Sequence, residues 1–161
     1  MQTTVPARPD VDLAPPKQRH WGRTILGVVL VIIAFDVAKD LADGVGDVST
    51  NGDRNAAAAK AAPLMTDVTD ELNAAQTAVN RGDIVVTAAH LNNAGDLMDE
   101  AAGYFDGGVD TTLYGYMHSA AEHFHNAADD ALLQHFTAAA AEMDAATTAL
   151  NEAEAYVRSQ T

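Results

Sequence analysis

The chain has 161 residues, no cysteine and a formal net charge of −14 at pH 7. The lack of cysteine excludes disulfide bonds, thiol catalysis and a lipid anchor attached through cysteine. The acidic balance argues against nucleic-acid binding, which requires clustered Lys and Arg side chains, and it favours solubility or contact with cations and basic partners. The length fits one compact domain plus a tether.

Residues 1–20 are rich in proline, with Pro6, Pro9, Pro15 and Pro16. Proline lacks a backbone N–H and fixes its own φ angle, so closely spaced prolines oppose regular structure. We predict a disordered tail here.

An uncharged apolar run follows at Thr24–Phe35, TILGVVLVIIAF, and it is 12 residues long. Signal-peptide cores have about 7–15 apolar residues, whereas a membrane-spanning helix needs about 20. Trp21 suits the headgroup zone and Arg23 can extend its charge outward, so a helix over 21–41 would be about 31 Å long and able to span. We therefore predict a signal anchor over 21–41. Its anchoring residues are Trp21, Arg23, Ile25, Leu26, Val28, Val29, Leu30, Val31, Ile32, Ile33 and Phe35.

The alternative is a cleaved signal peptide, which would release a secreted domain. Cleavage needs a small-x-small site. Ile32–Ala34 lies inside the apolar run and Asp36–Ala38 begins with an acidic residue, so neither matches well. Retention of the segment is the favoured prediction.

Charge is distributed unevenly along the chain. Up to Phe35 it carries four basic and two acidic residues, a net +2, and the remainder carries −16. Because basic residues stay on the cytoplasmic side of a span, we expect a cytoplasmic N-terminus and an extracytoplasmic C-terminal domain.

The segment 42–54 contains three glycines among acidic and hydroxyl residues and is predicted to be a flexible linker. From residue 55 to residue 161 the chain is rich in alanine, and its apolar residues recur at helical spacing. The first stripe is Met65, Val68, Leu72, Ala75 and Val79, on a helix whose first turn suits Pro63. Gly82 and Asp83 then predict the end of this helix and the capped start of the next one. The second is Ile84, Thr87, Leu91, Ala94, Met98, Ala101 and Phe105.

Two further stripes follow a glycine-rich break at 106–110, after which Asp110 or Thr111 is predicted to cap the next helix. They are Leu113, Met117, Ala120, Phe124, Ala127 and Ala131, and then Phe136, Ala139, Met143, Ala146, Leu150, Ala153 and Val157. The two stripes are out of phase, which predicts a break near 126–130. The fold class is therefore all-α, an up-down four-helix bundle behind a single transmembrane helix. The alternative is a three-helix bundle with one long C-terminal helix over 111–158.

One polar stripe has the spacing of metal ligands. His118, Glu122 and His125 step by four and three residues along one helix, so a metal such as Zn²⁺ or Cu²⁺ is a candidate ligand. The stripe is centred about 130° from the apolar stripe of the same helix, taking 100° per residue. It is therefore expected to face solvent, and a solvated polar face is the default interpretation.

Aromatic residues flank the loop 106–110. In an up-down bundle this loop and the C-terminus lie at the membrane-proximal end. We therefore predict an interface there, because tyrosine is enriched at membrane and protein interfaces. Its members are Tyr104, Phe105, Tyr114, Tyr116 and Tyr156.

No glycine-rich phosphate loop, nucleophile elbow or catalytic triad pattern is present, so we predict no enzyme, no catalytic residue and no cofactor. The predicted function is a membrane-anchored accessory or scaffolding subunit, which binds a larger membrane or cell-envelope complex through its helical domain. Because alanine buries little area, a partner protein or a second copy would add burial to a thin core. The alternative is an extracytoplasmic sensor bundle that binds a ligand or a metal.

Overall fold

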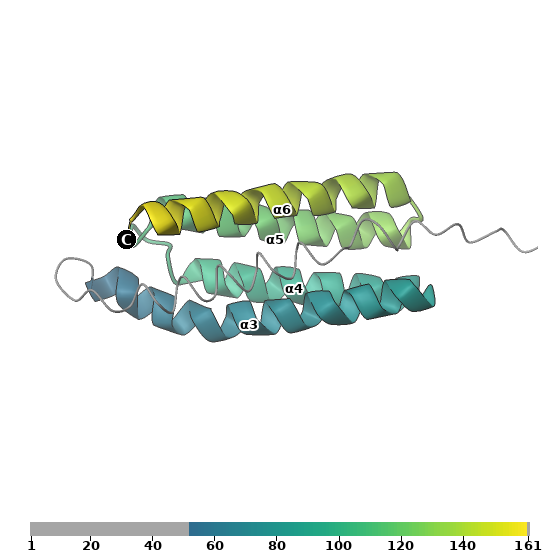
Figure 1. Ribbon diagram of the computed structural model, residues 1–161, viewed down its shortest axis with the longest axis horizontal. Coiled ribbons are helices and arrows are strands. Elements are labelled where there is room, and N and C mark those ends of the chain that lie inside the picture. Colours follow the sequence, from purple (N-terminus) through teal and green to yellow (C-terminus); the bar gives the residue numbers. More distant parts are fainter. Residues whose placement is uncertain (1–51, 161) are drawn as a thin grey trace, which may run out of the picture.

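The computed structural model describes residues 52–160, which form four helices and, within this range, no strand. They are α3 (Gly52–Arg81), α4 (Ile84–Gly103), α5 (Thr111–Leu132) and α6 (Phe136–Ser159) (Figure 1). The predicted tail, the anchor over 21–41 and linker residues 42–51 lie outside the described residues.

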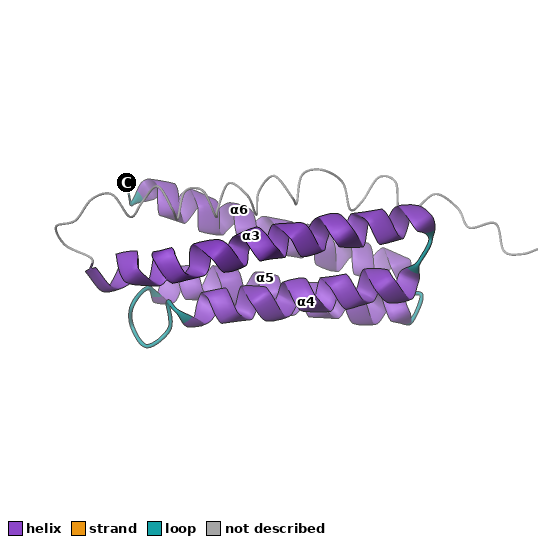
Figure 2. Cartoon of the chain, turned by 90° about the horizontal axis from the view of Figure 1, so that it is seen from below, coloured by secondary structure: helices purple, strands orange, loops and turns teal. Residues whose placement is uncertain are grey.

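Each helix packs against the next one in the chain, so α3 contacts α4, α4 contacts α5 and α5 contacts α6. In Figure 1, α3 and α4 lie below α5 and α6, and the four helices run lengthwise along the molecule. The start of α3, the loop 104–110 and the end of α6 lie at one end, called here the loop end. The turns 82–83 and 133–135 lie at the other, the turn end (Figure 2).

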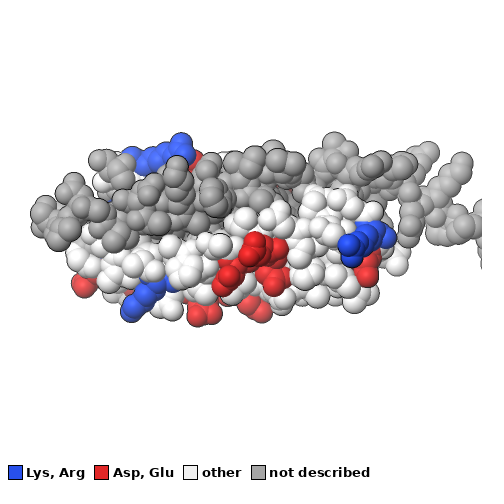
Figure 3. All heavy atoms as spheres, turned by 60° about the horizontal axis from the view of Figure 1, so that its bottom comes forward, with Lys and Arg blue, Asp and Glu red and all other residues white. Residues whose placement is uncertain are grey.

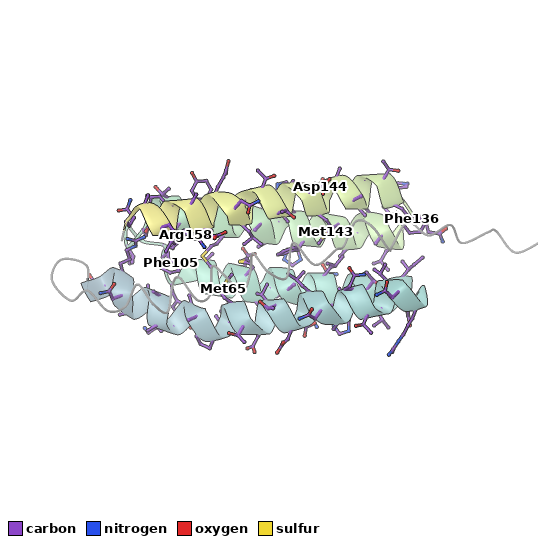
Figure 4. All side chains as sticks on the ribbon, in the orientation of Figure 1. Met65, Phe105, Phe136, Met143, Asp144 and Arg158 are labelled. Atoms are coloured by element: carbon purple, nitrogen blue, oxygen red, sulfur yellow. The ribbon has the colours of Figure 1, made fainter. Side chains whose placement is uncertain are left out.

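The core is made of the predicted apolar stripes. The members of the third stripe are all buried, and Met65, Phe105 and Met143 lie between the helices (Figure 4). Only Val79, Ile84 and Phe136 among the stripe residues are half-buried. Many of the other core residues are alanine, which lets helices approach closely but contributes little apolar area each.

The boundaries of α3 differ from the prediction. The helix begins at Gly52, inside the predicted linker, and Pro63 lies within it rather than in its first turn. Pro63 and Ala59 are both exposed. The backbone carbonyl that a proline leaves without a helical donor is therefore on the solvent side, where water can bond to it.

The turn between α3 and α4 confirms the predicted stop and restart. Gly82 has a φ of 75°, which glycine adopts without steric cost. Its N–H donates to Val79 O at 2.9 Å, and Asp83 N donates to Ala78 O at 3.0 Å. The Asp83 side chain then accepts from Val86 N at 3.1 Å and caps α4.

The break between α5 and α6 was predicted at 126–130, and that position is wrong. Helix α5 continues to Leu132, and the single long helix over 111–158 is also excluded. Gln134 turns the chain with a φ of 61°. The turn is closed by His135 N donating to Asp130 O at 2.8 Å and Gln134 N donating to Ala131 O at 3.0 Å. The same bonding pattern closes the glycine turn, but here no glycine marks it in the sequence.

Candidate functional site

At the loop end, Asp110 ties two helices together. Its side chain is almost fully buried, and Oδ1 accepts from Leu113 N at 3.0 Å to cap α5. Its other oxygen, Oδ2, accepts from Arg54 Nε of α3 at 2.8 Å. Capping by Asp110 was one of the two predicted alternatives, whereas Arg54 had been assigned to the linker. Nothing near either residue in the sequence indicates this pairing, because Arg54 and Asp110 are far apart along the chain.

The four tyrosines lie at this end, and the contacts of their rings fall into three groups. Tyr116 and Tyr156 are 6.3 Å apart between centroids, and the Arg54 guanidinium lies 5.6 Å from the Tyr156 ring centroid. Lys60 Nζ lies 5.6 Å from the Tyr104 centroid. The structure therefore divides the predicted set into separate cation–π and aromatic contacts.

The remaining tyrosine, Tyr114, stacks on His118 with centroids 5.4 Å apart and an interplanar angle of 9°. All four tyrosines are half-buried. Phe105 is fully buried in the core and cannot present a surface to a partner. It is therefore removed from the predicted interface.

The exposed apolar surface lies at the opposite end. Within residues 52–160, four large hydrophobic side chains are exposed, and all belong to the turn end. They are Val85 at 69%, Val86 at 40%, Leu132 at 48% and Leu133 at 65%. We call these four residues the aliphatic patch. The sequence signal was present but unused: consecutive apolar residues in one helical turn cannot all face the core.

The two halves of the aliphatic patch lie at the same level. Val85 and Val86 are in the first turn of α4, and Leu132 and Leu133 end α5. The two helices are antiparallel neighbours, and contacts such as His125 Nδ1 to Asn92 Oδ1 at 3.1 Å fix their register. That register brings the start of α4 beside the end of α5.

The structure brings two of the three predicted metal ligands close together. His118 Nε2 is 3.7 Å from Glu122 Oε1, while His118 Nδ1 is 2.7 Å from Asp99 Oδ1 of α4. His125 instead faces Asn92 and Asp96, with Nε2 3.6 Å from Asp96 Oδ1. Within residues 52–160, no group of three or more His, Cys, Asp or Glu side chains is arranged to hold a metal ion.

A glycine makes room for the His125 ring. Gly95 is buried in α4, and a Cβ there would lie 2.7 Å from two atoms of that ring. Glycine inside a helix costs about 1 kcal/mol relative to alanine. The space it leaves is occupied by the chain's own imidazole.

All five histidines within residues 52–160 face carboxylates. Three of them approach a carboxylate of the neighbouring helix through Nδ1, and we call these contacts the seam pairs. They are His90–Glu71 at 2.6 Å, His118–Asp99 at 2.7 Å and His123–Glu142 at 2.6 Å. The hydrogen bond to Asp99 raises the pKa of His118 above its ordinary 6.5, and the charges of Asp99 and Glu122 add to this against the opposing effect of burial.

Acidic side chains outnumber basic ones in residues 52–160, by 17 to four. Figure 3 shows Asp and Glu gathered along the middle of one face of the bundle, with Lys and Arg nearer its ends.

None of the helices within residues 52–160 is both long and apolar enough to cross a membrane. Comparisons with protein-family models, curated proteins and solved structures found no match to this chain.

Proposed function

We propose that the protein is a membrane-anchored, non-enzymatic accessory or scaffolding subunit that docks on a larger membrane or cell-envelope complex through its helical domain. The aliphatic patch carries this proposal. A small bundle with an acidic surface has little reason to expose four large aliphatic side chains at one end unless another surface covers them.

The location of the patch favours a protein partner beyond the tether. The chain enters the bundle at Gly52, at the loop end, and the patch lies at the other end of the helices (Figure 2). The apolar run Thr24–Phe35 and the basic residues before it support an anchor on the side of Gly52. The partner would then meet the bundle at the end away from its own anchor.

The distribution of charge also favours partner binding at the turn end. Residues 52–160 carry four Lys or Arg and 17 Asp or Glu, a net charge of −13. The turn 80–86, by contrast, holds one Arg and one Asp, and residues 132–138 hold neither Lys, Arg, Asp nor Glu. The patch therefore sits among few charged residues, so covering it with an apolar partner surface buries little charge.

Binding is tested by purifying the full chain from its native membranes in mild detergent and identifying the proteins that accompany it. The double variant Val85→Glu/Leu133→Glu is expected to lose a partner that the unaltered chain retains. The matched control is Ala141→Glu/Ala155→Glu, which adds the same charge at two exposed positions of α6. Recovery of a lone monomer from all three samples contradicts the proposal, as does a partner that survives the patch variant.

The anchor is tested separately. Carbonate extraction of membranes and sequencing of the mature N-terminus distinguish a retained anchor from a cleaved signal peptide. We expect the chain to stay in the membrane pellet with residues 1–41 intact. An N-terminus at Phe35 or Lys39, just after the two weak cleavage sites, would make the protein a secreted one.

A further inference from the structure

The seam pairs cross each junction between consecutive helices of the described chain. The ring of His90 joins α4 to α3, the ring of His118 joins α5 to α4, and the ring of His123 joins α5 to α6. The chain therefore places a titratable ring, rather than Lys or Arg, opposite a carboxylate at all three junctions.

Histidine supplies much of the available positive charge. Residues 52–160 contain five histidines but only four Lys or Arg. Two of those cations are used elsewhere, because Arg54 pairs with Asp110 and Arg158 pairs with Glu154. Protonation of all five histidines would change the charge of this region from −13 to −8.

Further polar groups surround the carboxylates and rings of the seam pairs. Glu71 also accepts from Asn93 Nδ2 at 3.3 Å, and Glu142 accepts from Asn126 Nδ2 at 3.5 Å. These amides hold the carboxylates in place without neutralising them. His118 faces two carboxylates, Asp99 on α4 and Glu122 on its own helix, and the ring of Tyr114 lies on one of its faces.

We propose that the seam pairs make the helical domain pH-responsive, so that its helices hold together more tightly in mildly acidic than in alkaline medium. A neutral ring donates an ordinary hydrogen bond to the carboxylate, whereas a protonated ring donates a charge-assisted bond, which is shorter and about twice as strong. The proposal does not depend on the anchor or on the partner.

The sign follows from His118. Its pKa is raised in the folded chain, so the folded state binds the proton more tightly than the unfolded state. The added stability is fully present below the ordinary value of 6.5 and is lost as the pH rises through the higher value of the folded chain. Histidines that are buried without a partner have the opposite effect, because they must become charged on acidification.

The test is thermal unfolding of the full chain in a non-ionic detergent at about pH 5.5 and at about pH 8, monitored by circular dichroism. We expect the Tm to be higher at the lower pH by an amount of the order of 5 °C. The variant His90→Gln/His118→Gln/His123→Gln is expected to lose most of this difference. A Tm that is equal or lower at about pH 5.5 in the unaltered chain overturns the proposal, as does an undiminished difference in the triple variant.

Relief of general charge repulsion would also raise the Tm in acid, and a matched pair of single variants separates the two effects. His118→Gln removes a seam pair, while His135→Gln removes one titratable ring that is mostly exposed and faces Asp130 in the last turn of α5. We expect only His118→Gln to reduce the difference in Tm. Equal reductions in both would assign the effect to net charge and contradict the proposal. Should the triple variant not fold, proton NMR titration of the unaltered chain decides: a pKa for His118 at or below 6.5 overturns the proposal.

Discussion

The two ends of the bundle use apolar side chains in opposite ways. At the loop end, the tyrosine rings are half-buried and contact Arg54, Lys60, His118 or one another, and Phe105 is part of the core. At the turn end, the aliphatic patch is exposed and the turns are closed by backbone hydrogen bonds. The comparison teaches that an abundance of aromatic residues does not by itself identify a binding surface, because the fold can use those residues for its own closure.

Connection length explains much of this difference. Seven residues join α4 to α5, whereas two residues join α3 to α4 and three join α5 to α6. The longer loop can return Phe105 to the core and place Asp110 against Arg54. The short turns have no spare residues with which to cover Val85 or Leu133.

The largest expected effect in testing this contrast between the two ends is that of Phe105→Ala. We expect the free energy of unfolding to fall by about 3–5 kcal/mol, because a fully buried aromatic side chain is removed from the core. Urea unfolding of the full chain measures this change, with Tyr104→Ala as the control at a half-buried neighbour. A loss of unfolding free energy below about 1 kcal/mol would mean that Phe105 is not part of the core.

The second change is Asp110→Asn. It keeps an acceptor for the α5 cap but removes the charge that faces Arg54, so we expect a loss of about 1.5–3 kcal/mol. Asp106→Asn is the matched control, because Asp106 is exposed in the same loop. Similar unfolding curves for the two variants would mean that the ion pair does not stabilise the loop end.

The third change acts at the turn end. Gln134→Gly should stabilise the chain by about 1 kcal/mol, because glycine adopts a positive φ without the steric cost that glutamine bears. Gln134→Ala keeps that cost and should leave the Tm nearly unchanged. A glycine variant no more stable than the alanine variant would show that glutamine has a compensating contact in this turn.

The smallest expected effect on stability is that of Val85→Ser/Leu133→Ser. Both side chains are more than half exposed, so the free energy of unfolding should change by no more than about 0.5 kcal/mol. The same urea titration measures it. A loss of several kcal/mol would mean that the patch stabilises the bundle itself, and the contrast between the ends would then disappear.

The sequence predicted the helix faces well, because a 3.6-residue period directs apolar residues such as Leu91, Met117 and Leu150 to one side. It predicted the turn at Gly82 because glycine favours the conformation needed there. It placed the break between α5 and α6 incorrectly because Gln134 adopts that conformation without any local signal, and three backbone bonds from residues 133–135 stabilise it.

Contacts between distant residues were the least predictable. Arg54 and Asp110 are 56 positions apart, and neither has a neighbour in the sequence that reveals the other. The prediction that the polar stripe of α5 points away from the core did not foresee its contacts with α4. His118 and His125 lie on the flank of α5 rather than its core face, but their rings are long enough to reach Asp99 and Asn92 of α4. The angular position of a residue around the helix axis gives the direction of its side chain. It does not show whether that side chain reaches the neighbouring helix.

The length of α3 has a consequence of its own. At about 1.5 Å per residue, its 30 residues extend about 45 Å from Gly52 to the turn end. The other helices run alongside and stiffen it, so the domain can act as a strut of fixed length. The distance between Gly52 and the aliphatic patch is then set by the number of helical turns in α3. Lengthening all four helices by seven residues would move the patch about 10 Å further from Gly52.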